Sequence, residues 1–258
     1  MKDKVIVITG ASAGIGAAIA RKAGAEGARL VVAARRKAEL EAVARESGEG
    51  ALPVVTDVTV RADVESLARA AIERFGRVDV WINNAGRGIS RSVLELTDED
   101  LDVMIRDNVK SALYGMQAIA PHLIARGEGQ IINVSSVLGR VPYVPARSAY
   151  CAAKHALNAI TASLRLELRG KAPGVVITTV SPGPVATDFG ASALHGGANF
   201  RALPGTQTAE QVADVVLEAI RERHIDVYTD PAHADRVRAY FTDMAAFERD
   251  LPAGPPRS

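Results

Sequence analysis

A tyrosine and a lysine four residues apart, Tyr150 and Lys154, are the side chains of this sequence best suited to moving a proton. On a helix, residues at this spacing lie one above the other on the same face, and a lysine ammonium favours the phenolate form of a neighbouring tyrosine. Such a tyrosine can act as a general acid or base, although the ordinary pKa of a phenol is about 10. An exposed pair at chance spacing is the alternative.

Two serines precede this pair at the end of the apolar run IINV, residues 131–134. We interpret the run as a strand, so that Ser135 and Ser136 lie at its carboxyl end, where open α/β sheets bind ligands. Ser136 is then placed to hold a carbonyl or hydroxyl that Tyr150 protonates or deprotonates. A turn or a helix cap is the alternative role for both serines.

A glycine-rich turn follows the first apolar run of the chain, residues 5–8, and leads into a segment of helical composition. The turn reads Thr9-Gly10-Ala11-Ser12-Ala13-Gly14-Ile15-Gly16. Strand, glycine turn and helix in this order bring backbone N–H groups and the positive end of a helix together, which predicts a site for a pyrophosphate. A tight turn that binds nothing is the alternative.

The spacing of these glycines resembles the cofactor fingerprint of the short-chain dehydrogenase/reductase family. The likeness continues, in the family's order, through Asn83-Asn84-Ala85-Gly86 and through Pro182-Gly183 followed by Thr187, and covers about residues 4–230. The resemblance implies four catalytic residues, Asn108, Ser136, Tyr150 and Lys154, with Asn108 holding a water that links the lysine to solvent. It implies cofactor contacts from Gly10, Ser12, Gly14, Ile15, Gly16, Asp57, Val58, Asn84, Ala85, Gly86, Tyr150, Lys154, Pro182, Gly183, Val185 and Thr187.

The chain departs from the family pattern between Ser136 and Tyr150, which are fourteen positions apart, one more than is usual. We prefer Ser136 to Ser135 as the catalytic serine and infer an extra residue in the loop 139–148. Tyr143 and Arg147 lie in this loop, where they either face the substrate or, as is common for a loop arginine, are simply solvated.

The second expected strand, residues 28–34, ends in Arg35 and Arg36. In dinucleotide folds an acidic residue at this point binds the ribose 2′-OH, whereas arginine accommodates a 2′-phosphate. We therefore predict NADP(H) as the cofactor. NAD(H) stays the alternative, because Ala13 stands where many NADP-using relatives carry a basic residue. For Asp57, at the end of the third strand, capping of the next helix is the alternative to contact with the adenine.

Alternating strands and helices predict an α/β Rossmann-type fold, a doubly wound parallel sheet of about seven strands with helices on both faces. We expect a single domain over residues 1–250, helices over 61–75 and 97–126, and one more helix ending near residue 247. Thr97 and Asp100 form a capping-box-like start for the second helix. Residues 188–207 are expected to be a substrate lid, and 251–258 a disordered tail.

The composition of the chain limits the classes of partner that we expect. A net charge of +1 with 24% charged residues gives no reason to expect nucleic acid or an anionic membrane. A single cysteine excludes an internal disulfide framework, and with no signal peptide or membrane span in the sequence we expect a cytoplasmic protein without a metal. The apolar stripe over residues 153–168 and the resemblance imply a homo-oligomer, a tetramer or a dimer; an internal core face explains the stripe equally well.

The expected activity is reversible hydride transfer between NADP(H) and a small-molecule carbonyl or secondary alcohol, with Tyr150 as general acid/base. An NAD-dependent dehydrogenase of the same fold is one alternative. A nucleotide-sensing binding protein without catalysis is the other.

Overall fold

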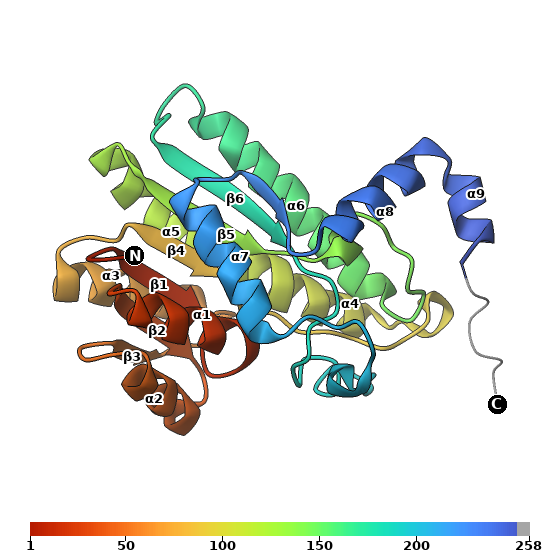
Figure 1. Ribbon diagram of the computed structural model, residues 1–258, viewed down its shortest axis with the longest axis horizontal. Coiled ribbons are helices and arrows are strands. Elements are labelled where there is room, and N and C mark those ends of the chain that lie inside the picture. The colour runs from red at the N-terminus through yellow and green to blue at the C-terminus, as the bar shows by residue number, and fades with distance from the viewer. Residues whose placement is uncertain (252–258) are drawn as a thin grey trace.

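Seven parallel strands form the sheet of this protein in a computed structural model that describes residues 1–251 (Figure 1). Their order across the sheet is β3-β2-β1-β4-β5-β6-β7. The strands are β1 Val5–Thr9, β2 Arg29–Ala34, β3 Leu52–Val55, β4 Val80–Asn83, β5 Gly129–Val134, β6 Val175–Ser181 and β7 Asp226–Tyr228. The strand order reverses between β1 and β4, which makes the crevice outside the carboxyl ends of these strands the expected ligand site. The predicted fold class is confirmed.

Alternate side chains of the central strands enter two different cores. In β1, Ile6 and Ile8 belong to the core on one face of the sheet, and Val5 and Val7 to the core on the other. A strand buried on both faces must be apolar at nearly every position, which is why the continuous run at residues 5–8 predicts this arrangement.

Helices cover both faces of the sheet. The first core includes residues of α1 Gly14–Ala25, α2 Lys37–Glu46 and α7 Ala209–Arg221, of which α1 and α7 lie in front of the sheet in Figure 1. The second core includes residues of α3 Arg61–Phe75, α5 Ser111–Arg126 and α6 Ser148–Leu168. In the stripe on α6, Ala153, Leu157 and Leu168 are buried within the chain itself. The internal core therefore accounts for much of the stripe, and the homo-oligomer stays a prediction.

A buried chain of polar side chains ties β4, β5 and α6 together. Trp81 Nε1 donates to Asn83 Oδ1 at 2.7 Å, and Asn83 Nδ2 donates to Asn133 Oδ1 at 2.8 Å. Asn133 Nδ2 in turn donates to Thr161 Oγ1 on α6 at 2.9 Å. All four side chains are buried, so each depends on its neighbour for the hydrogen bond that water cannot supply.

The single helix expected over residues 97–126 is wrong in its middle. The chain forms α4 Asp98–Ile105, a π-helical segment η2 Arg106–Lys110, and then α5. In this segment the side-chain amide of Asn108 donates to the Met104 carbonyl at 3.1 Å, and so competes with the backbone for an acceptor of the helical ladder. The predicted capping box is confirmed, since Thr97 Oγ1 accepts from the Asp100 N–H and the Asp100 carboxylate accepts from the Thr97 N–H.

The one helix expected up to residue 247 is also wrong, because two helices occupy this part, α8 Pro231–Thr242 and α9 Met244–Arg249. Asp243 between them has an extended backbone, and its side chain caps α9 by accepting from the Ala246 N–H at 2.9 Å. Both helices project from the body of the molecule (Figure 1). The expected tail lies outside the described residues except for Leu251. Short single-turn helices, η1 Val93–Glu95, η3 Val137–Gly139 and η4 Phe200–Ala202, complete the connections.

Gly115 of α5 packs directly on the buried polar chain. A Cβ at this position would collide with the side-chain amide oxygen Oδ1 of Asn83 and lie 2.6 Å from Trp81 Nε1. We expect Gly115→Ala to lower the free energy of unfolding by about 1–3 kcal/mol, although alanine gains about 1 kcal/mol of helix propensity. Urea unfolding followed by circular dichroism measures this. Gly170→Ala is the control, since among the described residues no atom lies within 4 Å of a Cβ built there; equal midpoints for the two variants would contradict the expectation.

Candidate active site

The carboxyl ends of the strands open onto a cavity of about 1130 Å³. It is lined by residues from every motif singled out in the sequence. These are Gly10, Ser12, Gly14, Ile15, Arg35, Arg36, Asp57, Val58, Asn84, Ala85, Gly86, Ser136, Tyr150, Lys154, Pro182, Gly183, Val185 and Thr187. Two predicted residues lie behind this wall: Gly16 packs against Gly10 and Asn84, and Asn108 lies behind Gly86.

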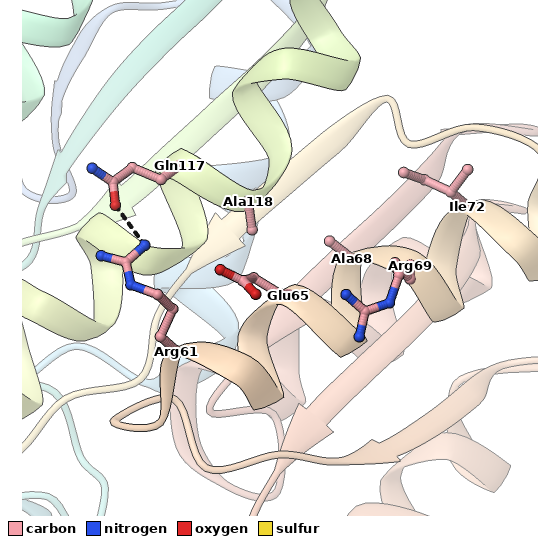
Figure 2. Close-up of a pocket in the computed structure, with 7 residues that line it drawn as sticks. All are labelled: Arg61, Glu65, Ala68, Arg69, Ile72, Gln117 and Ala118. Carbon is pink, nitrogen blue, oxygen red and sulfur yellow. Dashed lines mark hydrogen bonds between the residues drawn. The ribbon is translucent and has the colours of Figure 1, made fainter.

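A second hollow, of about 300 Å³, lies between α3 and α5 (Figure 2). There Arg61 donates to Gln117 Oε1 at 2.8 Å, and its guanidinium lies 4.3 Å from the centre of the Tyr114 ring. These contacts join two helices on the face of the sheet opposite α1 and α7. None of the predicted site residues lines this hollow. Among residues 1–251 no cluster of ligating side chains could hold a metal ion. The larger cavity is therefore the candidate active site.

The glycine turn forms one end of this cavity. Gly10 has a positive φ of 66°, and a Cβ there would lie 2.8 Å from Ala85 Cα, so the turn and the Asn-Ala-Gly segment approach to backbone contact. The helix α1 that follows has Ala13 as its N-cap residue, and within the described chain no side chain caps it. Its first N–H groups thus face the cavity without a side-chain acceptor, as an anion site requires.

Asn84 lines the cavity and also forms hydrogen bonds with the backbone of the glycine turn. Its Nδ2 donates to the carbonyls of Thr9 and Gly10 at 2.9 and 3.2 Å, and its own N–H donates to Thr9 Oγ1 at 3.1 Å. These bonds join the ends of β1 and β4 on the two sides of the switch point.

Arg35 and Arg36 follow β2 at the same edge of the sheet. Both arginines are exposed, and Arg36 Nη2 donates to Ser12 Oγ at 3.0 Å, which links the end of β2 to the glycine turn. Asp57, after β3, accepts from the N–H and the hydroxyl of Thr59 at 2.9 and 2.7 Å. The helix α3 begins after Val60, so the alternative that Asp57 caps this helix is wrong.

Tyr150 and Lys154 extend from the first turns of α6 and are both buried, with 7% and 4% of their surface exposed. Lys154 Nζ donates to the Val134 carbonyl at the end of β5 at 2.9 Å and lies 5.6 Å from the centre of the Tyr150 ring. Ser136 lies two residues after the end of β5 and caps η3, where its hydroxyl accepts from the Leu138 N–H at 3.1 Å. One strand end therefore positions the serine and anchors the lysine.

Asn108 reaches this group from the π-helical segment. Its Nδ2 donates to the Arg87 carbonyl at 2.9 Å, and its Oδ1 accepts from the Arg87 N–H at 3.2 Å. A Cβ on Gly86 would lie 2.8 Å from Asn108 Oδ1 and 3.6 Å from Lys154 Nζ, so the two polar groups meet at this glycine. Asn108 is 1% exposed within the π-helical segment, and such π-bulges are common at functional sites.

Burial sets the proton chemistry of the site. It raises the pKa of the Tyr150 phenol well above its ordinary value, while the hydroxyl of Ser136 and the charge of Arg147 act in the opposite direction. Burial also lowers the pKa of Lys154 to about 8. From the sequence, Lys154 was expected to be the cation that acts on the phenol, and no such effect was assigned to Arg147, although its place three residues before Tyr150 at the start of α6 was a usable signal. The role given to Lys154 stays a prediction.

Residues 4–196 match the family model described as short chain dehydrogenase. The chain belongs to the short-chain dehydrogenase family. An oxidoreductase of Staphylococcus epidermidis is 36% identical to it over 228 residues, which make up 88% of this chain and 95% of the relative. As a member of this family the chain is an oxidoreductase.

Solved structures of the family agree with the fold. A short-chain dehydrogenase/reductase from Burkholderia phymatum in complex with NAD has a TM-score of 0.86 and 30% identity, covering 100% of this chain and 98% of the other. A short-chain dehydrogenase from Burkholderia cenocepacia in complex with NADP has a TM-score of 0.83 and 27% identity, covering 98% and 99%. Across residues 1–251, no helix of this family member has the length and apolar character needed to cross a membrane.

The lowered pKa of Lys154 predicts how stability depends on pH. Its ordinary value is 10.5 and its folded value about 8, so between pH 8 and 10 the unfolded chain binds more protons and the free energy of unfolding rises with pH. Lys154→Met removes this dependence. We expect the stability of the variant relative to the wild type to fall by about 2 kcal/mol from pH 8 to pH 10, at 1.36 kcal/mol per pKa unit.

Urea unfolding at pH 7, 8, 9 and 10 measures this difference directly. Lys171→Met, at an exposed position beyond α6, is the control that reports any general effect of losing a lysine. A stability difference between Lys154→Met and the wild type that is constant over this range would refute the prediction.

Proposed function

We propose that this chain is an NADP(H)-dependent oxidoreductase that interconverts a carbonyl compound and a secondary alcohol, with Tyr150 as the general acid/base. One observation carries the proposal. Tyr150, Ser136 and Lys154, from two elements, are buried together at the carboxyl end of β5, in the cavity that the glycine turn also lines. A titratable group buried beside a hydroxyl and an ammonium is an arrangement suited to proton transfer.

The residues around the glycine turn fit a dinucleotide. The uncapped start of α1 offers N–H groups for a pyrophosphate, and Gly10, which has no side chain, lets the turn approach the backbone of Ala85. Lys154 and Thr187 line the cavity toward the expected nicotinamide end. When bound, a nicotinamide supplies or accepts the hydride, and the protein supplies position and proton.

In the reducing direction Tyr150 donates its proton to the carbonyl oxygen, and in the oxidising direction it removes the proton from the alcohol. A phenol whose pKa is raised by burial is protonated at neutral pH and is therefore ready as the acid. The Ser136 hydroxyl, beside the phenol, orients the reacting oxygen. Asn108 and Lys154 meet at Gly86 behind the tyrosine, where they support the return of a proton.

The preference for NADP(H) rests on the end of β2. Arg35 and Arg36 line the cavity there, and the sequence has no carboxylate at this point to bind a ribose 2′-OH. The two Burkholderia structures contain NAD and NADP respectively, so family likeness leaves the choice open. A nucleotide-sensing protein without catalysis is the remaining alternative. Turnover of a ketone by the wild type would exclude it.

Tyr150→Phe keeps the ring and its packing but deletes the group that titrates. We expect ketone reduction to fall by about 10²- to 10⁴-fold, the scale of general acid–base catalysis, while NADPH still binds. NADPH consumption on a panel of ketones and fluorescence titration of NADPH measure the two effects. Tyr240→Phe, on the projecting helix α8, is the matched control. Turnover close to that of the wild type in a folded Tyr150→Phe variant would rule out the mechanism.

Arg35→Ala tests the choice of cofactor. The wild type should bind NADPH at least about tenfold more tightly than NADH, a difference of about 1.4 kcal/mol, because a guanidinium forms charge-assisted hydrogen bonds with a phosphate. Arg35→Ala should lose most of this preference, and Arg45→Ala, an exposed arginine of α2, should retain it. Fluorescence titration with both cofactors gives the ratio; equal affinities in the wild type would count against NADP(H).

A further inference from the structure

A buried guanidinium without an ionic partner lies beneath the segment 188–207. Arg147 is 7% exposed, so the solvated role considered from the sequence is wrong. Within residues 1–251 its side chain forms no ion pair and no hydrogen bond, and its Nη1 is fully buried without a partner. Because an arginine keeps its charge in proteins, such a group needs an anion.

The surroundings of Arg147 leave room for this guanidinium and offer it no acidic side chain. A Cβ on Gly88 would lie 2.7 Å from Nη1, and a Cβ on Gly197 would lie 2.9 Å from Nη2, so two glycines flank the group. The ring of Phe200 lies 5.6 Å from it, and both side chains line the cavity. The guanidinium thus lies among backbone and an aromatic ring, and Arg147 forms part of the wall of the active-site cavity.

The acidic residues of the same cavity have other partners. Asp107 pairs with Arg106 at 2.9 Å, and Asp188 pairs with Arg201 at 3.0 Å. Asp57 lies beyond them after β3, where it accepts from Thr59. The missing anion is therefore one that enters the cavity.

Arg147 is also close to the reacting group. It is the residue before α6, three positions ahead of Tyr150, and its charge acts on the phenol. Phe189 from the segment 188–207 packs edge-on against the Tyr150 ring, with 5.7 Å between ring centres. Arg147 and Tyr150 both line the cavity, so a ligand bound there can contact both side chains.

We propose that the substrate carries a carboxylate that pairs with Arg147 while its carbonyl faces Tyr150. The substrate class is then an oxo acid and the corresponding hydroxy acid, with an apolar body that packs against Phe189, Phe200 and Leu203. A carboxylate matches the planar fork of a guanidinium and accepts two hydrogen bonds from it. This inference rests on the proposed oxidoreductase function and names its substrate class.

The test compares phenylglyoxylate with its methyl ester, which keeps the ketone and the ring but lacks the charge. The wild type should have the higher kcat/KM for the acid. Arg147→Met should lower the acid-to-ester ratio by about 10- to 100-fold, the scale of a hydrogen bond to a charged group. Arg147→Lys, which keeps the charge but not the fork, should give an intermediate ratio. Arg169→Met, at an exposed position just after α6, should leave the ratio at the wild-type value.

A second measurement does not depend on turnover. Calorimetric titration of benzoate should show binding to the wild type and about 10- to 100-fold weaker binding to Arg147→Met. An unchanged acid-to-ester ratio in Arg147→Met or Arg147→Lys, with the ester still reduced, would overturn the inference and leave the proposed function standing. Equal losses for acid and ester would also overturn it, since they indicate a purely structural role. If the wild type reduced no ketone, the proposed function would fail, whereas loss of benzoate binding in Arg147→Met would still support the anion site.

Discussion

The buried hydrogen bonds from Trp81 through Asn83 and Asn133 to Thr161 are the constraint on which the site depends. They link β4, β5 and α6 where water is excluded, so a helix displaced by one residue would leave several polar groups unsatisfied. Hydrophobic packing alone tolerates small shifts of a helix, but hydrogen bonds of fixed length do not. The position of α6, and with it that of Tyr150 ahead of Thr161 on the same helix, follows from this chain of bonds.

The same burial that rigidifies the helix gives the site its chemistry. Desolvation disfavours the charged form of each group, so it raises the pKa of the Tyr150 phenol and lowers that of the Lys154 ammonium. The lysine retains a hydrogen bond to the carbonyl of Val134 at the strand end. Tyr150 and Lys154 therefore lie side by side on α6 although burying either group disfavours its charged form. Such pairs of groups with shifted pKa values are common at functional sites.

The regular elements and the loops of this protein contribute different residues to the site. Strand ends and the long helices carry Tyr150, the proposed proton donor, and the glycine turn, whereas the loop before α6 and the segment 188–207 carry Arg147, Phe189 and Phe200. Loops at strand ends can change their side chains without disturbing the sheet, so substrate choice is expected to reside there. The unpaired guanidinium of Arg147, beneath the segment 188–207, is consistent with substrate choice residing in these loops.

Local patterns in the sequence determined the parallel sheet, the glycine turn, the helix α3 over residues 61–75 and the capping box of Thr97 and Asp100. Each is a matter of hydrophobic period or of groups a few residues apart, which a single stretch of sequence contains. Tertiary structure alone decided the π-helical segment around Asn108 and the burial of Arg147. The acceptor of the Asn108 amide includes the carbonyl of Arg87, 21 positions away, and the guanidinium of Arg147 is enclosed by Gly88 and Gly197, each at least fifty residues distant. Competition for a hydrogen bond and exclusion of water are settled by such distant neighbours, which no local period reports.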